Sequence, residues 1–116
     1  MVGLQSIVSR SVDPIDACVV SVGMLKAGTA FNVIAERCDI VGTVRSFNED
    51  TRSLAEAGIA RIAGYTAEMH GARAELEYIR GYPSVVNDDR EADRFFKVAS
   101  RLFGPAHVHS VKPIMA

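Results

Sequence analysis

The sequence lacks most of the features from which composition alone would suggest a function. It has no tryptophan, only two cysteines among 116 residues, and a formal net charge of −1. This near-neutral charge, without a block of basic residues, gives no reason to expect binding to nucleic acid or to an anionic membrane surface. No apolar run approaches the roughly 18 residues that a membrane-spanning helix needs. The N-terminus also lacks the charged and apolar regions of a signal peptide.

The two cysteines, Cys18 and Cys38, lie in runs with the composition of strands. Such a pair in a chain of ordinary composition is more typical of buried, reduced thiols than of a disulfide. Together with the missing signal peptide, this predicts a cytoplasmic protein.

Recognisable catalytic motifs are also absent. The sequence contains no glycine-rich phosphate loop, CxxC pair, HExxH or GxSxG. His107 and His109 would share one face of a strand, but a metal site needs three or four ligands, and no carboxylate or thiolate cluster accompanies them. His70 ends a predicted helix and Asp88-Asp89 begin another, so structural roles account for these residues. The residues alone therefore identify no nucleophile, general base or metal ligand.

The pattern of apolar residues predicts a mixed α+β fold. Periodicity and turn residues indicate helices at 2–10, 48–70 and 88–103, and strands at 17–25, 39–47, 72–80 and 108–114. Up to residue 80 this order lacks only a leading strand to form a β-α-β-β-α-β motif. We therefore expect a ferredoxin-like sandwich whose first strand is missing, followed by a helix and strand of a larger α/β domain. Such an arrangement predicts a piece of a longer protein.

Two polar side chains in the middle of the chain are candidate ligand-binding groups. Asn32 lies in an irregular loop, and Arg45 lies in the alternating strand 39–47. In that strand Ile40 and Val44 form the core-facing row, so Arg45 projects from the opposite face. An amide and a guanidinium are suited to holding a carboxylate or a peptide-like group. Plainer explanations are loop hydrogen bonds for Asn32, and solvation or an internal ion pair for Arg45.

A series of short motifs extends along most of the chain. In order, they are Leu4-Gln5-Ser6-Ile7-Val8-Ser9-Arg10, Asp13-Pro14, Val20-Ser21-Val22-Gly23, Ala27-Gly28-Thr29-Ala30-Phe31-Asn32-Val33-Ile34, Gly42-Thr43-Val44-Arg45-Ser46-Phe47, Gly81-Tyr82-Pro83 and Val86-Asn87-Asp88. This series resembles the M20 family of metal-dependent amidohydrolases and peptidases. The similarity is greatest to the branch that contains hippurate hydrolases and N-acyl-amino-acid amidohydrolases.

The resemblance implies that residues 1–82 are the family's lid, or dimerisation, domain. Residues 83–116 would then begin the return into the catalytic domain. In the family a pair of divalent metal ions, usually zinc or manganese, activates a water that attacks an amide carbonyl. The motifs for the metal ligands, the general base and a lid histidine do not occur here. The resemblance therefore assigns no catalytic or metal-binding residue to this chain, and the segment alone is expected to be inactive.

Two functional positions of the family match residues of this sequence. The loop asparagine matches Asn32 and the strand arginine matches Arg45, which implies that both bind substrate and that the arginine pairs with its carboxylate. In several members these lid groups act on the active site of the partner subunit or on closure. Ala35 departs from the usual proline and leaves the loop less stiff. The resemblance thus predicts an N-acyl amino acid substrate and a homodimer through the lid, with no nucleic-acid or membrane partner.

A function of another class is an alternative. A stand-alone, non-enzymatic ferredoxin-like module would dimerise or bind a small ligand. A third possibility is a family member that has lost its metal ligands and acts as a binding protein. Natural chain ends and a complete first strand would favour the module, whereas flanking metal-binding segments would favour the amidohydrolase.

Overall fold

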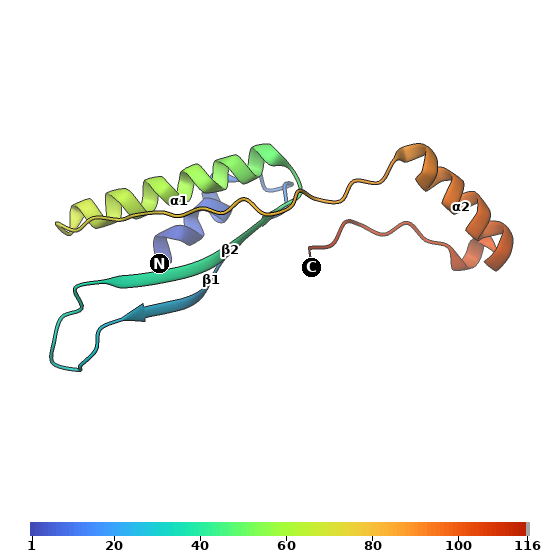
Figure 1. Ribbon diagram of the computed structural model, residues 1–116. Coiled ribbons are helices and arrows are strands. Elements are labelled where there is room, and N and C mark those ends of the chain that lie inside the picture. The colour runs from blue at the N-terminus through green and yellow to red at the C-terminus, as the bar shows by residue number, and fades with distance from the viewer. Residues whose placement is uncertain (116) are drawn as a thin grey trace. The chain divides into compact units, whose positions relative to one another are not determined.

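The computed structural model describes residues 1–115, and the chain divides into two compact units, Met1–Pro83 and Ser84–Ala116. The first unit contains η1 (Val2–Leu4), η2 (Ile7–Ser11), β1 (Cys18–Ala27), β2 (Cys38–Ser46) and α1 (Glu49–Met69) (Figure 1). The second contains α2 (Asp89–Phe103) and η3 (Pro105–His107). The described chain is therefore of the α+β class.

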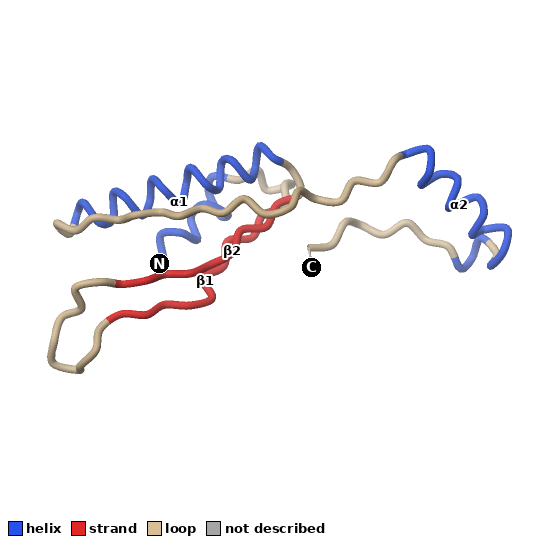
Figure 2. The backbone as a smooth tube through the Cα atoms, viewed as in Figure 1, coloured by secondary structure: helices blue, strands red, loops and turns tan. Residues whose placement is uncertain are grey.

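The sheet of the first unit is an antiparallel hairpin of β1 and β2 (Figure 2). Val20 lies opposite Val44, and both face the helices: Val20 is buried and Val44 packs against the core. Arg45 pairs with Val19 and is exposed, as expected for the opposite face of the strand. The alternation predicted for residues 39–47 is confirmed at Val44 and Arg45, whereas Ile40, predicted in the same core-facing row as Val44, is 46% exposed. The ladder has one irregularity, between Val22 and Met24.

The core of this unit is small and is centred on Ile7. Its side chain is fully buried, as is that of Ala55 on α1. Val12, Cys18 and Val20 complete the buried cluster. The predicted helix at 2–10 is confirmed as helical, but it consists of a 3-10 turn and a π-helical turn rather than a regular α-helix.

The ends of α1 follow the sequence prediction. The Asn48 side chain accepts a hydrogen bond from the backbone N–H of Thr51 at 2.7 Å. Gly71, just beyond the helix, has φ +67°, a conformation that favours glycine. The predicted apolar row of α1 contacts the core through Ala55, Ile59 and Ile62. Met69 was predicted in the same row, but it is 74% exposed.

The prediction of a strand at residues 72–80 is wrong for the described chain. This segment, here called the strap, is extended (Figure 1), but it belongs to no sheet in residues 1–115. Ala72 donates to the Ala67 carbonyl, and none of the described residues 73–80 makes a backbone hydrogen bond. Alternating side chains predict an extended backbone, but a strand also needs a neighbour. The sheet of the described residues accordingly has two strands, and the ferredoxin-like arrangement stays a prediction.

The second unit contains the helix predicted at 88–103. Asp88 Oδ1 accepts from the N–H groups of Arg90 and Glu91 at 3.0 and 3.1 Å, which confirms the predicted cap. The strand predicted at 108–114 is wrong, since that segment is irregular. Phe95 and Phe96 make an edge-to-face contact, with ring centroids 5.8 Å apart. No helix within residues 1–115 has the length and apolar character needed to cross a bilayer.

Candidate functional site

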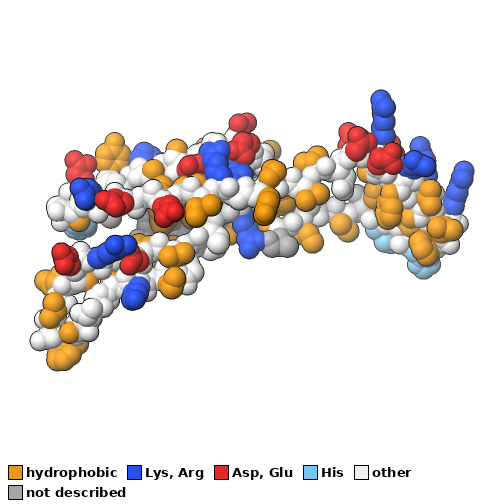
Figure 3. All heavy atoms as spheres, viewed as in Figure 1, with side chains coloured by type: hydrophobic (Ala, Val, Ile, Leu, Met, Phe, Trp, Pro, Cys, Tyr) orange, Lys and Arg blue, Asp and Glu red, His pale blue; other side chains and the backbone are white. Residues whose placement is uncertain are grey.

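Asn32 lies in the loop that joins β1 to β2, at the end of the hairpin. The loop residues on either side expose large apolar side chains: Phe31 is fully exposed and Ile34 is 97% exposed. Figure 3 shows hydrophobic side chains gathered at this end of the hairpin. Within residues 1–115 the Asn32 side chain has no hydrogen-bond partner. The plainer explanation, that it satisfies backbone groups of its own loop, is therefore not what the structure shows.

Arg45 lies near the opposite end of β2. Its guanidinium is exposed and has no hydrogen bond or ion pair among the described residues. An internal ion pair, one of the plainer explanations for this residue, is thus absent from the described part of the chain. A solvated side chain and a ligand-binding side chain both fit this environment.

The structure does not bring Asn32 and Arg45 together within one chain. The loop that carries Asn32 joins β2 at Cys38, and Arg45 lies seven residues further along the strand. At about 3.3 Å per residue this is roughly 23 Å of strand. Figure 1 shows the loop extending beyond the strand ends. One small ligand therefore cannot contact both side chains of the same chain in this conformation.

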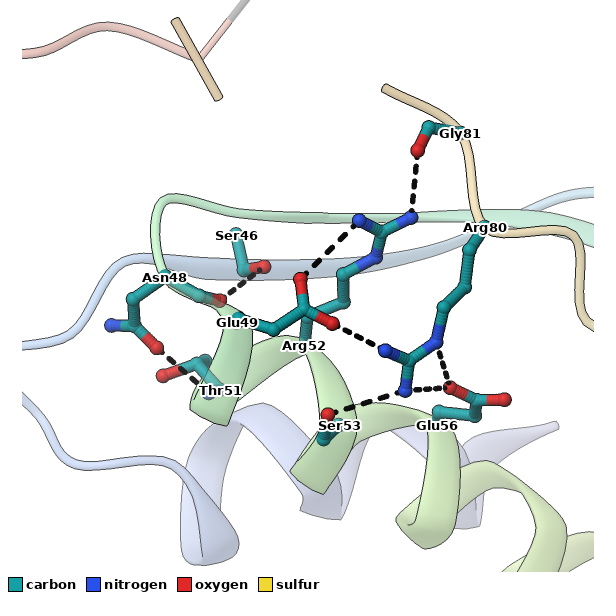
Figure 4. A network of polar contacts seen from close by, with 9 residues as sticks. All are labelled: Ser46, Asn48, Glu49, Thr51, Arg52, Ser53, Glu56, Arg80 and Gly81. Carbon is teal, nitrogen blue, oxygen red and sulfur yellow. Dashed lines mark hydrogen bonds and ion pairs between the residues drawn. The ribbon is translucent and has the colours of Figure 1, made fainter. Parts of the chain in front are cut away.

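A polar cluster that the sequence analysis missed fastens the end of the strap to α1 (Figure 4). Arg80 Nε donates to Glu56 Oε2 at 2.8 Å, and Arg80 Nη2 donates to Ser53 Oγ at 3.2 Å. A second ion pair joins Arg80 to Glu49. The hydrogen bond from Arg80 to Glu56 raises the pKa of the arginine above its ordinary value. We call Arg80 and its three partners the clasp.

The helical spacing of three residues in the sequence is a signal from which part of the clasp could have been predicted. Glu49, Ser53 and Glu56 follow one another at intervals of four and three residues, so one face of α1 presents all three. Arg52 extends the cluster, because its guanidinium donates to the Gly81 carbonyl at 3.0 Å. Burial, followed by the charge of Glu56, raises the pKa of Tyr78 on the strap. The end of the strap is thus held immediately before the boundary of the first unit.

The remaining candidates have structural explanations or no partners. Both cysteines are free: Cys18 is buried, whereas Cys38 is exposed, so the predicted burial is wrong for Cys38. Burial raises the pKa of the Cys18 thiol. His107 lies in η3, and His70 is the C-terminal cap of α1. Residues 1–115 contain no group of three or more His, Cys, Asp or Glu side chains that could hold a metal ion.

Comparison with known proteins finds relatives that are all named as amidohydrolases, hydrolases or deacetylases. YhaA of Bacillus subtilis, provisionally named an amidohydrolase, is 40% identical over 112 residues, which are 97% of this chain and 28% of YhaA. Hippurate hydrolase of Campylobacter jejuni is 37% identical over 117 residues, which are 100% of this chain and 30% of that enzyme. N-acetylcysteine deacetylase of Bacillus subtilis is 37% identical over 108 residues, 93% of this chain and 28% of the deacetylase.

The chain is homologous to the M20-type amidohydrolases. A solved structure supports this assignment, a protein of methicillin-resistant Staphylococcus aureus provisionally named an aminohydrolase. It matches with a TM-score of 0.75 and 30% identity over 88% of this chain and 26% of that protein. No protein-family model matches the chain. The chain spans 28 to 30% of the length of these amidohydrolase relatives.

Proposed function

We propose that this chain is part of a metal-dependent amidohydrolase that cleaves the amide bond of N-acyl amino acids such as hippurate. The observation that carries the proposal is the similarity, at 37% identity over the whole chain, to a hippurate hydrolase. An N-acyl-L-amino acid amidohydrolase of Geobacillus stearothermophilus is 44% identical over 74% of this chain. Both names describe substrates in which an amide bond lies close to a free carboxylate.

The proposed role of the first unit is to hold the substrate. Arg45 suits the carboxylate, because its exposed guanidinium has no partner in residues 1–115 and can make two parallel hydrogen bonds to two oxygens. Asn32 suits the amide, to which it can both donate and accept. Because the two side chains lie far apart along the hairpin, one active site contains either Asn32 of one subunit and Arg45 of another, or only one of these two residues. A homodimer is therefore part of the proposal.

The proposed zinc or manganese pair needs ligands from outside this chain. The described residues offer no suitable cluster, so we assign no step of the reaction to a metal held by this segment. In the proposal its residues bind and orient the substrate, and the segment alone has no activity. The cytoplasmic location stays a prediction.

The proposed fold is a ferredoxin-like sandwich completed by one additional strand. Its support is the strap, whose backbone from residue 73 to 80 has no hydrogen-bond partner among residues 1–115 although the segment is extended. A row of unpaired N–H and C=O groups along an extended segment is a template on which a neighbouring strand can pair. Hydrogen exchange on the full-length protein tests this proposal, because pairing would protect alternate strap amides. Fast exchange along the whole strap would contradict it.

The substrate role is tested with Arg45→Ala in the full-length protein. Hippurate and hippuramide, which lacks the carboxylate, are compared as substrates, with and without a chelator. We expect the wild type to prefer hippurate, and Arg45→Ala to lose about 10- to 100-fold of that preference, the value of a charge-assisted pair. Arg73→Ala is the matched control, since Arg73 is an exposed arginine paired only with Glu75 in the described chain.

The outcomes separate the proposed role from its alternatives. An unchanged preference in Arg45→Ala refutes the carboxylate role. Absence of hydrolysis by the wild type, together with binding of N-acyl amino acids, would replace the enzyme with a binding protein. Sedimentation of the full-length protein tests the homodimer, and a monomer would refute the assignment of both side chains to one site.

A further inference from the structure

The hairpin that carries Asn32 is held by the helices only along one half. Near its base, Cys18 and Val20 are at most 8% exposed against the core. Beyond the irregularity in the ladder, the large side chains are exposed on both faces: Met24 56%, Leu25 51%, Ile40 46% and Val41 51%. The outer half, here called the arm, therefore receives its direction from the hairpin itself. Figure 1 shows it extending away from α1.

The irregularity is a β-bulge at Gly23. Val22 pairs with Gly42 and Met24 pairs with Val41, so Gly23 is one extra residue in β1. The extra residue shifts the alternation of β1 by one position, so that Leu25, opposite Ile40, lies on the side of the sheet that carries Val20 and Val44. Without Gly23 the same pairs would form a regular ladder. What the bulge adds is therefore a local bend and a stronger twist.

Gly42 is the residue that permits the close approach of the strands at this bulge. A Cβ atom on Gly42 would lie 2.4 Å from the Ser21 carbonyl oxygen, which is backbone and cannot move aside as a flexible side chain would. A Cβ atom on Gly23 would meet nothing within 4 Å. The two glycines at the bulge are thus unequal, and only Gly42 is required by the space around it.

We propose that the bulge, formed by one extra residue at position 23 opposite Gly42, aims the arm and thereby positions Asn32. The effect of the bulge on catalysis rests on the proposed function, whereas the effect of the bulge on the direction of the arm is measured separately. From Gly42 to Cys38 the arm is roughly 13 Å long, so a change of about 20° in the bend moves Cys38 by about 4 Å. The loop beyond moves further. That displacement is larger than the reach of a hydrogen bond from Asn32.

The direct test measures the direction of the arm in the full-length protein by electron paramagnetic resonance. One nitroxide is placed on the exposed Cys38 and the other on Thr66→Cys, an exposed position of α1, with all other cysteines replaced. We expect deletion of Gly23, which removes the bulge and keeps the pairing, to shift the distance by up to about 4 Å. Gly42→Ala is expected to shift or broaden the distance, whereas Gly23→Ala leaves it unchanged.

The kinetic test uses the same variants with hippurate. If the bulge aims Asn32, deletion of Gly23 raises KM to the value of Asn32→Ala, and combining the two changes raises it no further. A merely structural role would instead lower the fraction of active protein and leave KM unchanged. Because Gly42→Ala carries a backbone clash and can fail to fold, the Gly23 deletion is the deciding variant.

Three results would overturn the inference. These are an unchanged distance on deletion of Gly23, an equal shift in the Gly23→Ala control, and additive effects of the Gly23 deletion and Asn32→Ala on KM. If the wild type hydrolyses no N-acyl amino acid, the proposed function fails. The distance measurement then still decides whether the bulge aims the arm.

Discussion

Two glycines inside α1 provide a quantitative test of how this unit is packed. A helix-interior glycine costs about 0.5–1 kcal/mol relative to alanine, so replacing either residue by alanine should stabilise the helix equally in the absence of contacts. A Cβ atom on Gly64 would meet nothing within 4 Å. A Cβ atom on Gly58 would lie 3.1 Å from Ile7, whose side chain is fully buried.

The two substitutions should therefore have different effects. We expect Gly64→Ala to stabilise the protein by about 0.5–1 kcal/mol. Gly58→Ala gains the same helix stabilisation but adds an overpacking cost of about 1–3 kcal/mol, because the side chain of Ile7 is fully buried and has little space to move. The expected difference between the variants is about 1–3 kcal/mol. Urea unfolding followed by the helical circular dichroism signal measures it, with equal m-values as the condition for comparison.

A double-mutant cycle identifies the contact responsible. Ile7→Val alone should cost about 0.5–1.5 kcal/mol as a buried truncation. Combined with Gly58→Ala it should cost less, because it removes Cδ1 of Ile7, which would lie 3.3 Å from the new methyl group, and so relieves part of the overlap. Equal stabilisation by both alanines, or strict additivity with Ile7→Val, would refute the close packing of η2 on α1.

Further predictions concern the caps, the clasp and the cysteines. Asn48→Ala should destabilise α1 by about 1 kcal/mol, since the cap to Thr51 is lost, and urea unfolding measures this. Arg80→Gln should accelerate hydrogen exchange of α1 around Glu56 and proteolysis of the strap, with a smaller effect in 1 M salt because ion pairs are screened; equal effects from Arg73→Gln would contradict the clasp. Folding raises the pKa of Cys18 from 9.0 and that of Tyr78 from 10.0. Both groups therefore ionise more readily in the unfolded chain, so their contribution to the free energy of unfolding is complete below about pH 9 and is lost as the pH rises. Cys18→Ala should flatten the first part of that loss in a pH series of unfolding midpoints. A thiol reagent should modify Cys38 rapidly and Cys18 only on unfolding, which mass spectrometry of the peptides resolves.

The sequence predicted the features that depend on neighbouring residues. The cap at Asn48, the ending at Gly71 and the alternation that separates Val44 from Arg45 all follow from side-chain chemistry within a few positions. The ordered motifs also predicted the amidohydrolase homology that the relatives confirm. The roles of Asn32 and Arg45 in substrate binding stay predictions.

The sequence failed where a feature depends on a partner distant along the chain. Alternation at residues 72–80 predicted a strand, but no neighbour pairs with it among residues 1–115. The burial of Cys38 was predicted from its strand-like surroundings, but the side chains of the arm are not covered by the helices and the thiol is exposed.

What the sequence determined by itself is the two long helices with their caps and the two strands of the hairpin, because caps, turns and periodicity act over a few residues. Tertiary structure decided that Gly58 faces Ile7 while Gly64 faces open space, and that Arg80 meets Glu49 and Glu56 across a distance of over 20 residues. It also decided that Asn32 and Arg45 lie at opposite ends of one hairpin. These outcomes depend on which surfaces contact each other after folding, and such contacts between distant residues cannot be read from the spacing of residues along the chain.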